Sequence, residues 1–440
     1  MSRISFENVE ASVRDLRVSR AMGRISSVGG GSVRVAGLTR AAAIGDLVRL
    51  DAASGPIGGE VIGIDAEGIT VLTDATPRGL AIGTRVVHLG PATLSPDDSW
   101  VGRIIDPLGR PLDGRPLLPG TTRRGIDGDA PEAATRRGLG ARLSTGFCVF
   151  NTFLPLVRGQ RIGLFAGSGV GKSTLMAGLA QKVQADITVI ALVGERGREL
   201  REFTDRVLGP EGMARCVVVA ATSDQSASMR RRCAPAAMSV AEHFRDQGKQ
   251  VLLLTDSVTR FADAHREIAL TQGEQPSLQG HPPSLVPLIT GLCERAGPGS
   301  MECAGDITAI FTVLVAGSDM EGAVADTLRG VLDGHVVLDR QIAERGRFPA
   351  IDLLRSVSRA LPHAASDQEN TLIAEGRRLI GAFERAEMMI QAGLYAKGSD
   401  KTIDSAIHAH PLLDNFIAQS ETKDVHGSFV SLARCLSRKS

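Results

Sequence analysis

The spacing of hydrophobic and polar positions changes along the chain, and each change predicts a different kind of structure. Between Gly23 and Leu89 the apolar residues form short alternating or β-branched runs separated by glycine-containing turns. Brief strands and turns at this spacing are typical of a small antiparallel barrel. The runs are Val33–Val35, Leu47–Leu50, Val61–Ile64, Ile69–Leu72 and Val86–Leu89. We predict a small β-barrel over residues 21–92.

The preceding residues, 1–20, are charged and weakly helical. Phe6, Val9, Val13 and Leu16 recur at helical spacing,. Such a segment can dock on a partner, but a frayed terminus explains the pattern equally well. We treat residues 1–20 as a separate N-terminal segment.

From about Thr145 to Pro362 the pattern alternates between continuous apolar runs and helical periodicity. Runs that are apolar on both faces belong to a parallel sheet covered by helices, which predicts a doubly wound α/β domain. The candidate strands are 161–165, 187–193, 215–221, 250–255 and 307–315. We assign residues 93–362 to this domain.

The connection that enters this domain, residues 91–145, is rich in proline, glycine and arginine. Turn chemistry dominates it, and we interpret its arginines mainly as a solvated surface or a subunit contact. They are Arg123, Arg124, Arg136, Arg137 and Arg142.

The C-terminal residues, 363–440, contain helical periodicity and no candidate strand, which predicts a helical domain. The helical segments are 367–392, 401–409, 411–419 and 425–437.

Composition narrows the function classes. The 440 residues are too many for one typical core, and 43% apolar with 22% charged residues is ordinary for a globular protein,. The net charge of +1 gives no support to nucleic acid as a partner,. The predicted barrel carries no aromatic residue between Phe6 and Trp100, so it lacks platforms for stacking bases,.

The sequence contains no recognisable targeting signal and no cysteine pair that would indicate a metal or disulfide site. No apolar stretch approaches the ~20 residues of a membrane span, and the first residues are too polar for a signal peptide. We therefore expect a cytoplasmic protein. The six cysteines include no C-x-x-C pair, which disfavours zinc and disulfide frameworks and favours buried free thiols,.

A glycine-rich loop is the strongest chemical signal. It follows the apolar run 161–165 and opens a helical pattern from Leu175 to Val183. A strand, a small-residue loop and a helix in this order form a phosphate-binding loop, in which backbone N–H groups and the helix start face an anion. The predicted nucleotide-binding residues are Gly167, Ser168, Gly169, Val170, Gly171, Lys172, Ser173 and Thr174.

Two side chains of this loop have separate predicted roles. Lys172 reaches the outer phosphates, and the Ser173 hydroxyl ligates Mg²⁺ that accompanies ATP. The motif departs from its general form because Ala166 stands where a glycine is expected. A methyl group is tolerated there if the backbone is not left-handed. The alternative is a glycine-rich turn that binds nothing.

Asp256 directly follows the apolar run 250–255. Beside a phosphate loop, a carboxylate at this place holds Mg²⁺ through its water shell, because Mg²⁺ keeps several waters and few protein ligands. The alternative is a strand-end aspartate that caps the helix beginning near Ser257.

Glu195 and Arg196 follow the run 187–193. A carboxylate at the end of a strand beside the phosphate loop can orient and polarise the attacking water. Glu195 is a better candidate than Glu199, which lies one turn further into the following helix. Arg196 can reach the γ-phosphate. A solvated helix start is the alternative for these charges.

Phe348 precedes a proline and offers a flat apolar face suited to an adenine ring, although a buried core phenylalanine is the default for any single Phe.

Together these motifs resemble the rotary ATPase superfamily of F1-type catalytic subunits over nearly the whole chain. Within it, residues 165–173 look like the flagellar export-apparatus ATPase and its relative, the ATPase of virulence type III secretion; Ala166 is then the family's own form. The other stretches that carry the resemblance are 194–199, 254–260, 282–284, 332–340 and 356–359.

The resemblance implies a small barrel, a central P-loop (RecA-like) ATPase domain and a helical C-terminus. It implies a homohexameric ring that delivers unfolded export substrates to the membrane gate. Expected partners are an export-apparatus regulator, a central stalk protein and chaperone-substrate complexes, with peripheral attachment at the inner face of the cytoplasmic membrane. Arg359 is then an arginine finger that reaches a neighbouring subunit's nucleotide.

The chain departs from the family in three residues. Phe348 stands where tyrosine is usual, which removes a hydroxyl but keeps a stacking face. Cys148 and Asn151 stand where arginine and aspartate are more frequent, which leaves the local polar contacts open.

Other functions remain as alternatives. An F1- or V-type catalytic subunit is disfavoured because phosphate loop, candidate base Glu195 and candidate finger Arg359 all occur in one chain, whereas rotary synthases divide them between two kinds of subunit. A nucleic-acid motor is disfavoured by the aromatic-free barrel and neutral charge. A non-catalytic ring subunit is disfavoured by the set Lys172, Glu195 and Asp256. Flagellar and virulence secretion are not separated by these residues.

Overall fold

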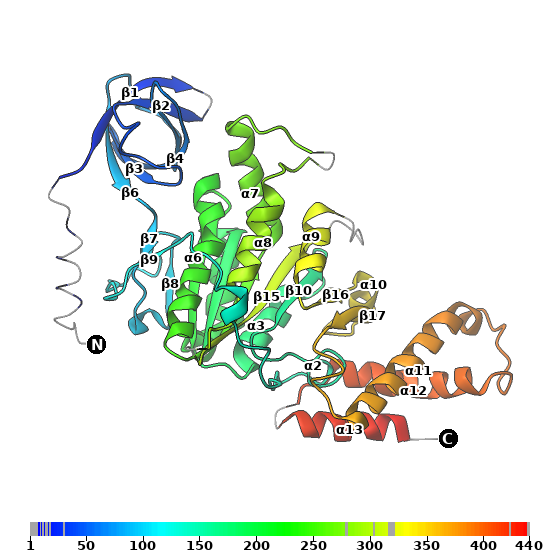
Figure 1. The fold of residues 1–440 in the computed structure, drawn as a ribbon. Coiled ribbons are helices and arrows are strands. Elements are labelled where there is room, and N and C mark those ends of the chain that lie inside the picture. The colour runs from blue at the N-terminus through cyan, green and yellow to red at the C-terminus, as the bar shows by residue number, and fades with distance from the viewer. Residues whose placement is uncertain are drawn as a thin grey trace.

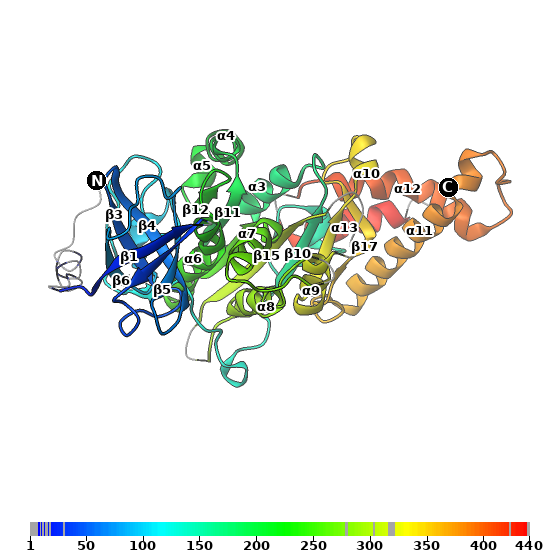
Figure 2. The same ribbon diagram turned by 90° about the horizontal axis from the view of Figure 1, so that it is seen from above.

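A barrel, a central sheet covered by helices and a helical end follow one another along the chain. The computed structural model describes residues 8, 10, 13, 16, 19–29, 31–277, 280–301, 304–315, 322–421 and 424–437. The predicted N-terminal segment of residues 1–20 therefore lies largely outside the described residues. Figures 1 and 2 show the barrel and the C-terminal helices at opposite ends of the molecule, with the central sheet between them.

The barrel closes through antiparallel strands in the order β1-β2-β5-β4-β3-β6. Val33 and Val35 point inward and are buried, while Arg34 between them is partly exposed. This alternation confirms the predicted barrel. The strands are β1 (Met22–Gly29), β2 (Ser32–Ala36), β3 (Leu47–Ala52), β4 (Gly55–Ile64), β5 (Ile69–Thr73) and β6 (Arg85–Gly90). The apolar runs found in the sequence did not predict β1, because Ile25 is the one large apolar side chain of this strand that is buried.

A buried ion cluster attaches the barrel to the central domain. Glu60 of β4 accepts hydrogen bonds from Arg231 and, at 2.7 Å, from Arg232, both on α6 (Ala227–Asp246). The Glu60 and Arg232 side chains are only 3% and 5% exposed. Because a buried charge is costly without its partner, this cluster fixes how the barrel is seated on α6.

The central sheet has the strand order β17-β16-β10-β15-β13-β11-β12-β8. Neighbours from β16 to β8 are parallel, whereas β17 runs antiparallel to β16, and the short β14 runs antiparallel to β15. All five predicted strands are present. The strands are β8 (Arg103–Ile105), β10 (Arg161–Ala166), β11 (Ile187–Glu195), β12 (Cys216–Thr222), β13 (Gln250–Asp256), β14 (Gly297–Pro298), β15 (Asp306–Leu314), β16 (Gly334–Leu338) and β17 (Ile351–Ser358).

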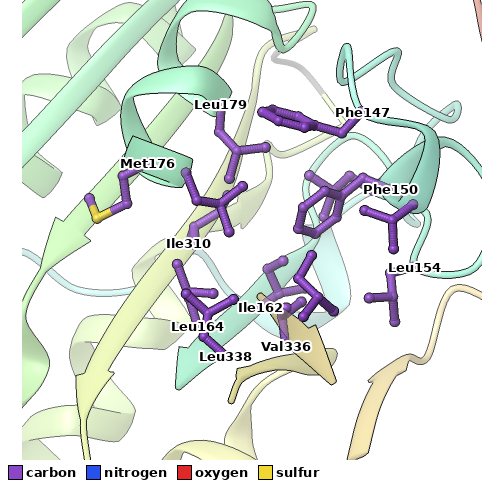
Figure 3. Packing of buried hydrophobic residues seen from close by; sticks show 14 of the residues in the cluster. Phe147, Phe150, Leu154, Ile162, Leu164, Met176, Leu179, Ile310, Val336 and Leu338 are labelled. Carbon is purple, nitrogen blue, oxygen red and sulfur yellow. The ribbon is translucent and has the colours of Figure 1, made fainter. Parts of the chain in front are cut away.

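Helices cover both faces of this sheet, as the doubly wound pattern predicts. One face packs against α6, α7 (Val258–Thr271), α8 (Leu285–Arg295) and α9 (Ala323–Val331). The other packs against α2 (Cys148–Asn151), α3 (Lys172–Lys182) and the C-terminal helices. Figure 3 shows how Phe147 and Phe150 lie with Leu179 of α3 above Ile162 and Leu164 of β10. This packing holds the strand and the helix that flank the glycine-rich loop.

Shorter elements complete the central part of the chain. They are β7 (Thr93–Leu94), η1 (Asp98–Trp100), β9 (Arg124–Gly125), η2 (Ala133–Thr135), α4 (Gly197–Glu202), η3 (Phe203–Leu208), α5 (Gly209–Met213) and α10 (Arg340–Glu344).

The C-terminal end is helical, as predicted: α11 (Asp367–Gln391), α12 (Lys401–Ala418) and α13 (Val425–Ser437). Ser366 and Glu369 form a capping box that starts α11,. The prediction of two separate helices at 401–409 and 411–419 is wrong, because α12 is one helix that continues through Pro411. A proline costs a helix one backbone hydrogen bond and some bending, and packing of buried residues such as Leu413 and Phe416 outweighs this,.

Asn151 stands where aspartate is more frequent in the family, and the structure shows which polar contacts it makes. Its side chain is fully buried and accepts hydrogen bonds from the backbone N–H and hydroxyl of Thr145, at 3.0 and 2.8 Å. Its amide donates to the Ser428 hydroxyl of α13 at 3.0 Å. A neutral amide thus satisfies this buried position and joins α2 to α13.

The arginines of the connection are not mainly a solvated surface, which corrects that interpretation. Arg136 pairs with Glu294 at 3.0 Å and Arg137 with Asp306 at 2.6 Å. Arg124 pairs with Asp246 at 2.6 Å. Arg142 donates to the carbonyl of Asn151 at 2.7 Å and its side chain is 11% exposed. Most of these partners are more than 100 residues away, so no local pattern indicates them.

Replacement of Glu60 by alanine is expected to destabilise the protein by about 3–5 kcal/mol, because it leaves the Arg232 guanidinium buried without its main partner. Urea-induced unfolding followed by circular dichroism measures the change. Glu67→Ala is the matched control: Glu67 pairs with Arg34 at 3.5 Å, but its side chain is 87% exposed. The control is expected to cost less than about 1 kcal/mol. Equal shifts for both variants would contradict the anchoring role.

Candidate active site

The glycine-rich loop lies at the carboxyl end of β10, between that strand and α3. Gly169 and Gly171 have φ angles of +77° and +85°, which is the left-handed region that glycine adopts without steric cost. Ala166 is buried as the last residue of β10, and the described non-glycine residues all have negative φ. The alanine methyl is therefore accommodated, as the sequence argument required. The loop has the strand, turn and helix start of an anion cradle.

Lys172 and Asp256 form a buried ion pair at the centre of the site. The ammonium donates to Asp256 Oδ1, and the two side chains are 11% and 6% exposed. The Thr312 hydroxyl of β15 donates to the same oxygen at 2.8 Å. The carboxyl end of β13, the start of α3 and the strand β15 thus bring their polar groups together.

The structure separates the two interpretations of Asp256. The N-cap of α7 is Ser257, whose hydroxyl accepts the Arg260 backbone N–H at 3.4 Å. Asp256 itself points to Lys172 and Thr312. The capping role therefore belongs to the next residue, and the Asp256 carboxylate faces the phosphate loop.

Glu195 ends β11 and its side chain is 16% exposed. Burial raises its pKa to about 7, assisted by a hydrogen bond with Glu199 and by the negative charge of Asp256, while Arg260 and Lys172 oppose the rise. The pKa of Glu199 is lowered, chiefly by the same hydrogen bond. Glu195 is therefore a half-ionised carboxyl near neutral pH, which is suited to accepting a proton.

Arg196 is largely exposed beside the site. Its side chain is 73% exposed and lies 3.4 Å from Glu199 of α4. In the isolated chain Arg196 has the environment of a solvated helix start.

A cavity of about 300 Å³ lies beside these groups. Ser173 and Thr174 of α3, the carboxyl groups of Glu195 and Asp256, and Glu199 are among its lining residues. Ser173 and Thr174 are exposed. The space in front of the loop is thus open to a ligand and bounded by the predicted catalytic carboxyl.

The donor set of this cavity fits Mg²⁺. Mg²⁺ prefers hard oxygen ligands and takes only one or two from the protein when a nucleotide supplies others. The Ser173 hydroxyl and the Asp256 carboxylate are such oxygens and line the same cavity. When bound, the ion would neutralise phosphate charge.

Phe348 lies over the phosphate loop. A methyl group placed on Gly171 would come within 3.0 and 3.2 Å of two carbons of the Phe348 ring. The side chain is 51% exposed, so it is not a core phenylalanine. An exposed ring beside the loop is available to stack on a base.

Arg359 lies away from the phosphate loop of its own chain. It follows β17, where Ser358 pairs with Gly334, the first residue of β16. The loop instead follows Ala166, which pairs with Leu338 at the other end of β16. Four residues of strand correspond to roughly 13 Å. Arg359 is exposed and donates to the Arg329 carbonyl at 3.2 Å.

Sequence reasoning missed two residues of the site. Arg260 lies 3.6 Å from Glu195 and donates to the Gly194 carbonyl. Thr312 comes from β15, which carries no motif. Arg260 stands within the stretch 254–260 that carries the family resemblance, so a signal for it existed; nothing in the sequence marks Thr312.

Family models match two parts of the chain. The model "ATP synthase alpha/beta family, nucleotide-binding domain" matches residues 146–358, and the model "T3SS EscN ATPase C-terminal domain" matches residues 365–428. The chain is also 41% identical to the flagellum-specific ATP synthase of Caulobacter vibrioides, over 94% of this chain and 95% of that protein. The chain belongs to the family of flagellar and type III secretion ATPases. It is an ATPase, and the family and the fold are those that the sequence predicts.

Other members of the family are similar over nearly their full length. The flagellum-specific ATP synthase of Salmonella typhimurium is 39% identical, covering 94% of this chain and 93% of that protein. The type 3 secretion system ATPase of Xanthomonas euvesicatoria is 38% identical, with coverage of 93% and 92%. The C-terminal match to the secretion family distinguishes this export ATPase from an F1- or V-type catalytic subunit.

Solved structures of the family share the fold. The assembled ATPase EscN of the enteropathogenic E. coli type III secretion system superposes with a TM-score of 0.86 at 36% identity, covering 94% of this chain and 100% of EscN. EscN in complex with its central stalk EscO gives a TM-score of 0.84 at 37% identity, with the same coverage. Within the described part of this export ATPase, no helix combines the length and apolar character needed to cross a bilayer.

The rate of hydrolysis is expected to depend on the ionisation of Glu195. Only the carboxylate accepts a proton, so kcat/KM should rise as the pH increases through about 7 and level off above it,. In Glu199→Gln the midpoint should move to lower pH, because an amide donates to the carboxylate and no longer raises its pKa. Steady-state ATPase assays over a pH series measure both. An unchanged midpoint in this variant would contradict the pairing of the two carboxyls.

Proposed function

We propose that this export ATPase binds Mg·ATP with residues 167–174 and hydrolyses it with Glu195 as the group that activates water. The buried pair of Lys172 and Asp256 beside an open cavity is the observation that carries the proposal. Lys172, Arg196 and an Arg359 from the next subunit meet the charge of the transition state. Phe348 stacks on the adenine ring, and Ser173 and Asp256 hold Mg²⁺.

The active unit is a homohexameric ring. Arg359 lies roughly 13 Å along the strand from its own phosphate loop,, so its guanidinium can serve a nucleotide only across an interface. Identical copies then complete every site. The assembled state named for EscN supports this arrangement by similarity.

The ring works in flagellar protein export. Flagellum-specific relatives in several bacteria match over most of their length. We propose that hydrolysis promotes delivery of unfolded substrates at the inner face of the cytoplasmic membrane. A central stalk protein, an export-apparatus regulator and chaperone-substrate complexes are the partners, and the complex of EscN with EscO supports the stalk. Virulence secretion is the second candidate, favoured by the similarity to EscN.

Lys172→Gln is expected to reduce turnover by at least about 10²-fold, because transition-state charge loses its fixed counter-charge. The substitution removes the opposite charge of the buried Asp256 carboxylate, so the thermal midpoint should fall, but the circular dichroism spectrum below the midpoint should stay that of the folded protein,. Phosphate release and circular dichroism measure the two effects. Unchanged hydrolysis would remove the site assignment.

Arg359→Gln is expected to lower turnover by about 10³-fold or more while sparing nucleotide binding by the monomer. Co-expression of this variant with Lys172→Gln tests the shared site. In mixed rings, about a quarter of the interfaces combine an intact cradle with an intact finger, so hydrolysis should return. A mixture no more active than either variant alone would contradict a finger acting between subunits.

Deletion of the coding sequence separates the two export systems. Loss of swimming and of filament-protein export is expected. Normal swimming with loss of secreted effector proteins would instead identify the virulence system.

A further inference from the structure

Arg347, the residue before Phe348, is a buried arginine that the mechanism above does not use. Its side chain is 10% exposed and lies in the loop between α10 and β17. The guanidinium donates to the carbonyls of Pro349 at 3.2 Å and Ile351 at 2.9 Å. One side chain therefore clamps the backbone on the far side of Phe348.

The same guanidinium is tethered to the C-terminal helices. Arg347 Nε lies 2.8 Å from the Asp414 carboxylate on α12, in an ion pair whose aspartate is 43% exposed. The guanidinium therefore holds two carbonyls by hydrogen bonds and the carboxylate by its charge, a combination of fixed directions that a lysine ammonium lacks,. The loop that carries Phe348 is thus connected through one residue to a helix of the C-terminal end.

Phe348 in turn lies directly over the phosphate loop, next to Gly171. The backbone after it is held a second time, since Asp339 N–H donates to the Ala350 carbonyl at 2.8 Å. The backbone that follows Phe348 is thus held by contacts from both Arg347 and Asp339.

We propose that Arg347 is a positioning residue for adenine recognition: tethered by Asp414, it holds the loop so that Phe348 presents its face beside the phosphate cradle. This inference rests on the proposed role of Phe348. The inference further states that the position of α12 affects the affinity for the adenine base but not the affinity for the phosphates.

A neighbouring ion pair gives a matched control. Arg345 of the same loop lies 3.2 Å from Glu387 of α11. Both pairs border one cavity of about 370 Å³ between the central sheet and the C-terminal helices. Both also join this loop to the helical end, but the contacts that hold Pro349 and Ile351 come from Arg347.

The test compares Asp414→Ala with the control Arg345→Gln in the full-length protein. Binding of ATP and of inorganic tripolyphosphate, each with Mg²⁺, is measured by calorimetry, and KM and kcat by phosphate release. Removal of stacking on Phe348 is expected to weaken ATP binding roughly tenfold. Asp414→Ala, which only loosens the position of Phe348, is expected to weaken ATP binding severalfold, up to that limit. It should raise KM, leave kcat nearly unchanged and leave tripolyphosphate binding unchanged. The control should alter none of these.

Equal weakening of ATP and tripolyphosphate binding by Asp414→Ala would overturn the proposal, because it would indicate a general loss of packing. An unchanged ATP affinity would overturn it as well.

Phe348→Ala separates this failure from a failure of the proposed function. If Phe348→Ala leaves ATP affinity unchanged, the adenine role falls and the inference falls with it. If Phe348→Ala weakens ATP binding and Asp414→Ala does not, only the inference falls. In the double variant, Asp414→Ala should add no further loss.

Discussion

The buried carboxylate of Asp256 is the constraint on which the site depends. A carboxylate that is 6% exposed requires an opposite charge and further hydrogen bonds to stay ionised,. Lys172 supplies the charge and Thr312 the hydrogen bond. Lys172 begins α3 after the loop that follows β10, Thr312 lies on β15 and Asp256 ends β13, so the adjacency of these three strands brings the three side chains together. The Lys172 side chain at the end of the phosphate loop is therefore held by a carboxylate of the sheet.

The same pair lies beside the cavity in which we propose that the nucleotide binds, so a γ-phosphate there would compete with Asp256 for the Lys172 ammonium. The Asp256 carboxylate would then lack its counter-charge, and together with the Ser173 hydroxyl of the same cavity it would offer two oxygen ligands to Mg²⁺,. A bound Mg²⁺ would thus compensate part of the phosphate charge that the Lys172 ammonium does not balance alone.

Local sequence predicted the features that depend on neighbouring residues, and missed those that depend on distant ones. The barrel, the five core strands, the phosphate loop and the place of Asp256 follow from spacing, turn residues and strand ends. Strand β17 escaped prediction because Leu354 and Arg355 side by side are exposed and interrupt its alternation. Arg136 and Arg137 looked solvated because their partners, Glu294 and Asp306, are more than 150 residues away. The roles assigned to the site residues, and the domain boundaries at 92 and 362, stay predictions.

Arginines that tie distant segments together are a recurring device in this chain. Arg232 seats the barrel, Arg142 reaches the start of α11 at Glu369, and Arg347 reaches α12 at Asp414. In each case one guanidinium meets more than one oxygen, so a single side chain fixes an orientation as well as a distance. A purely apolar contact at these places would hold the parts together without fixing the angle between them.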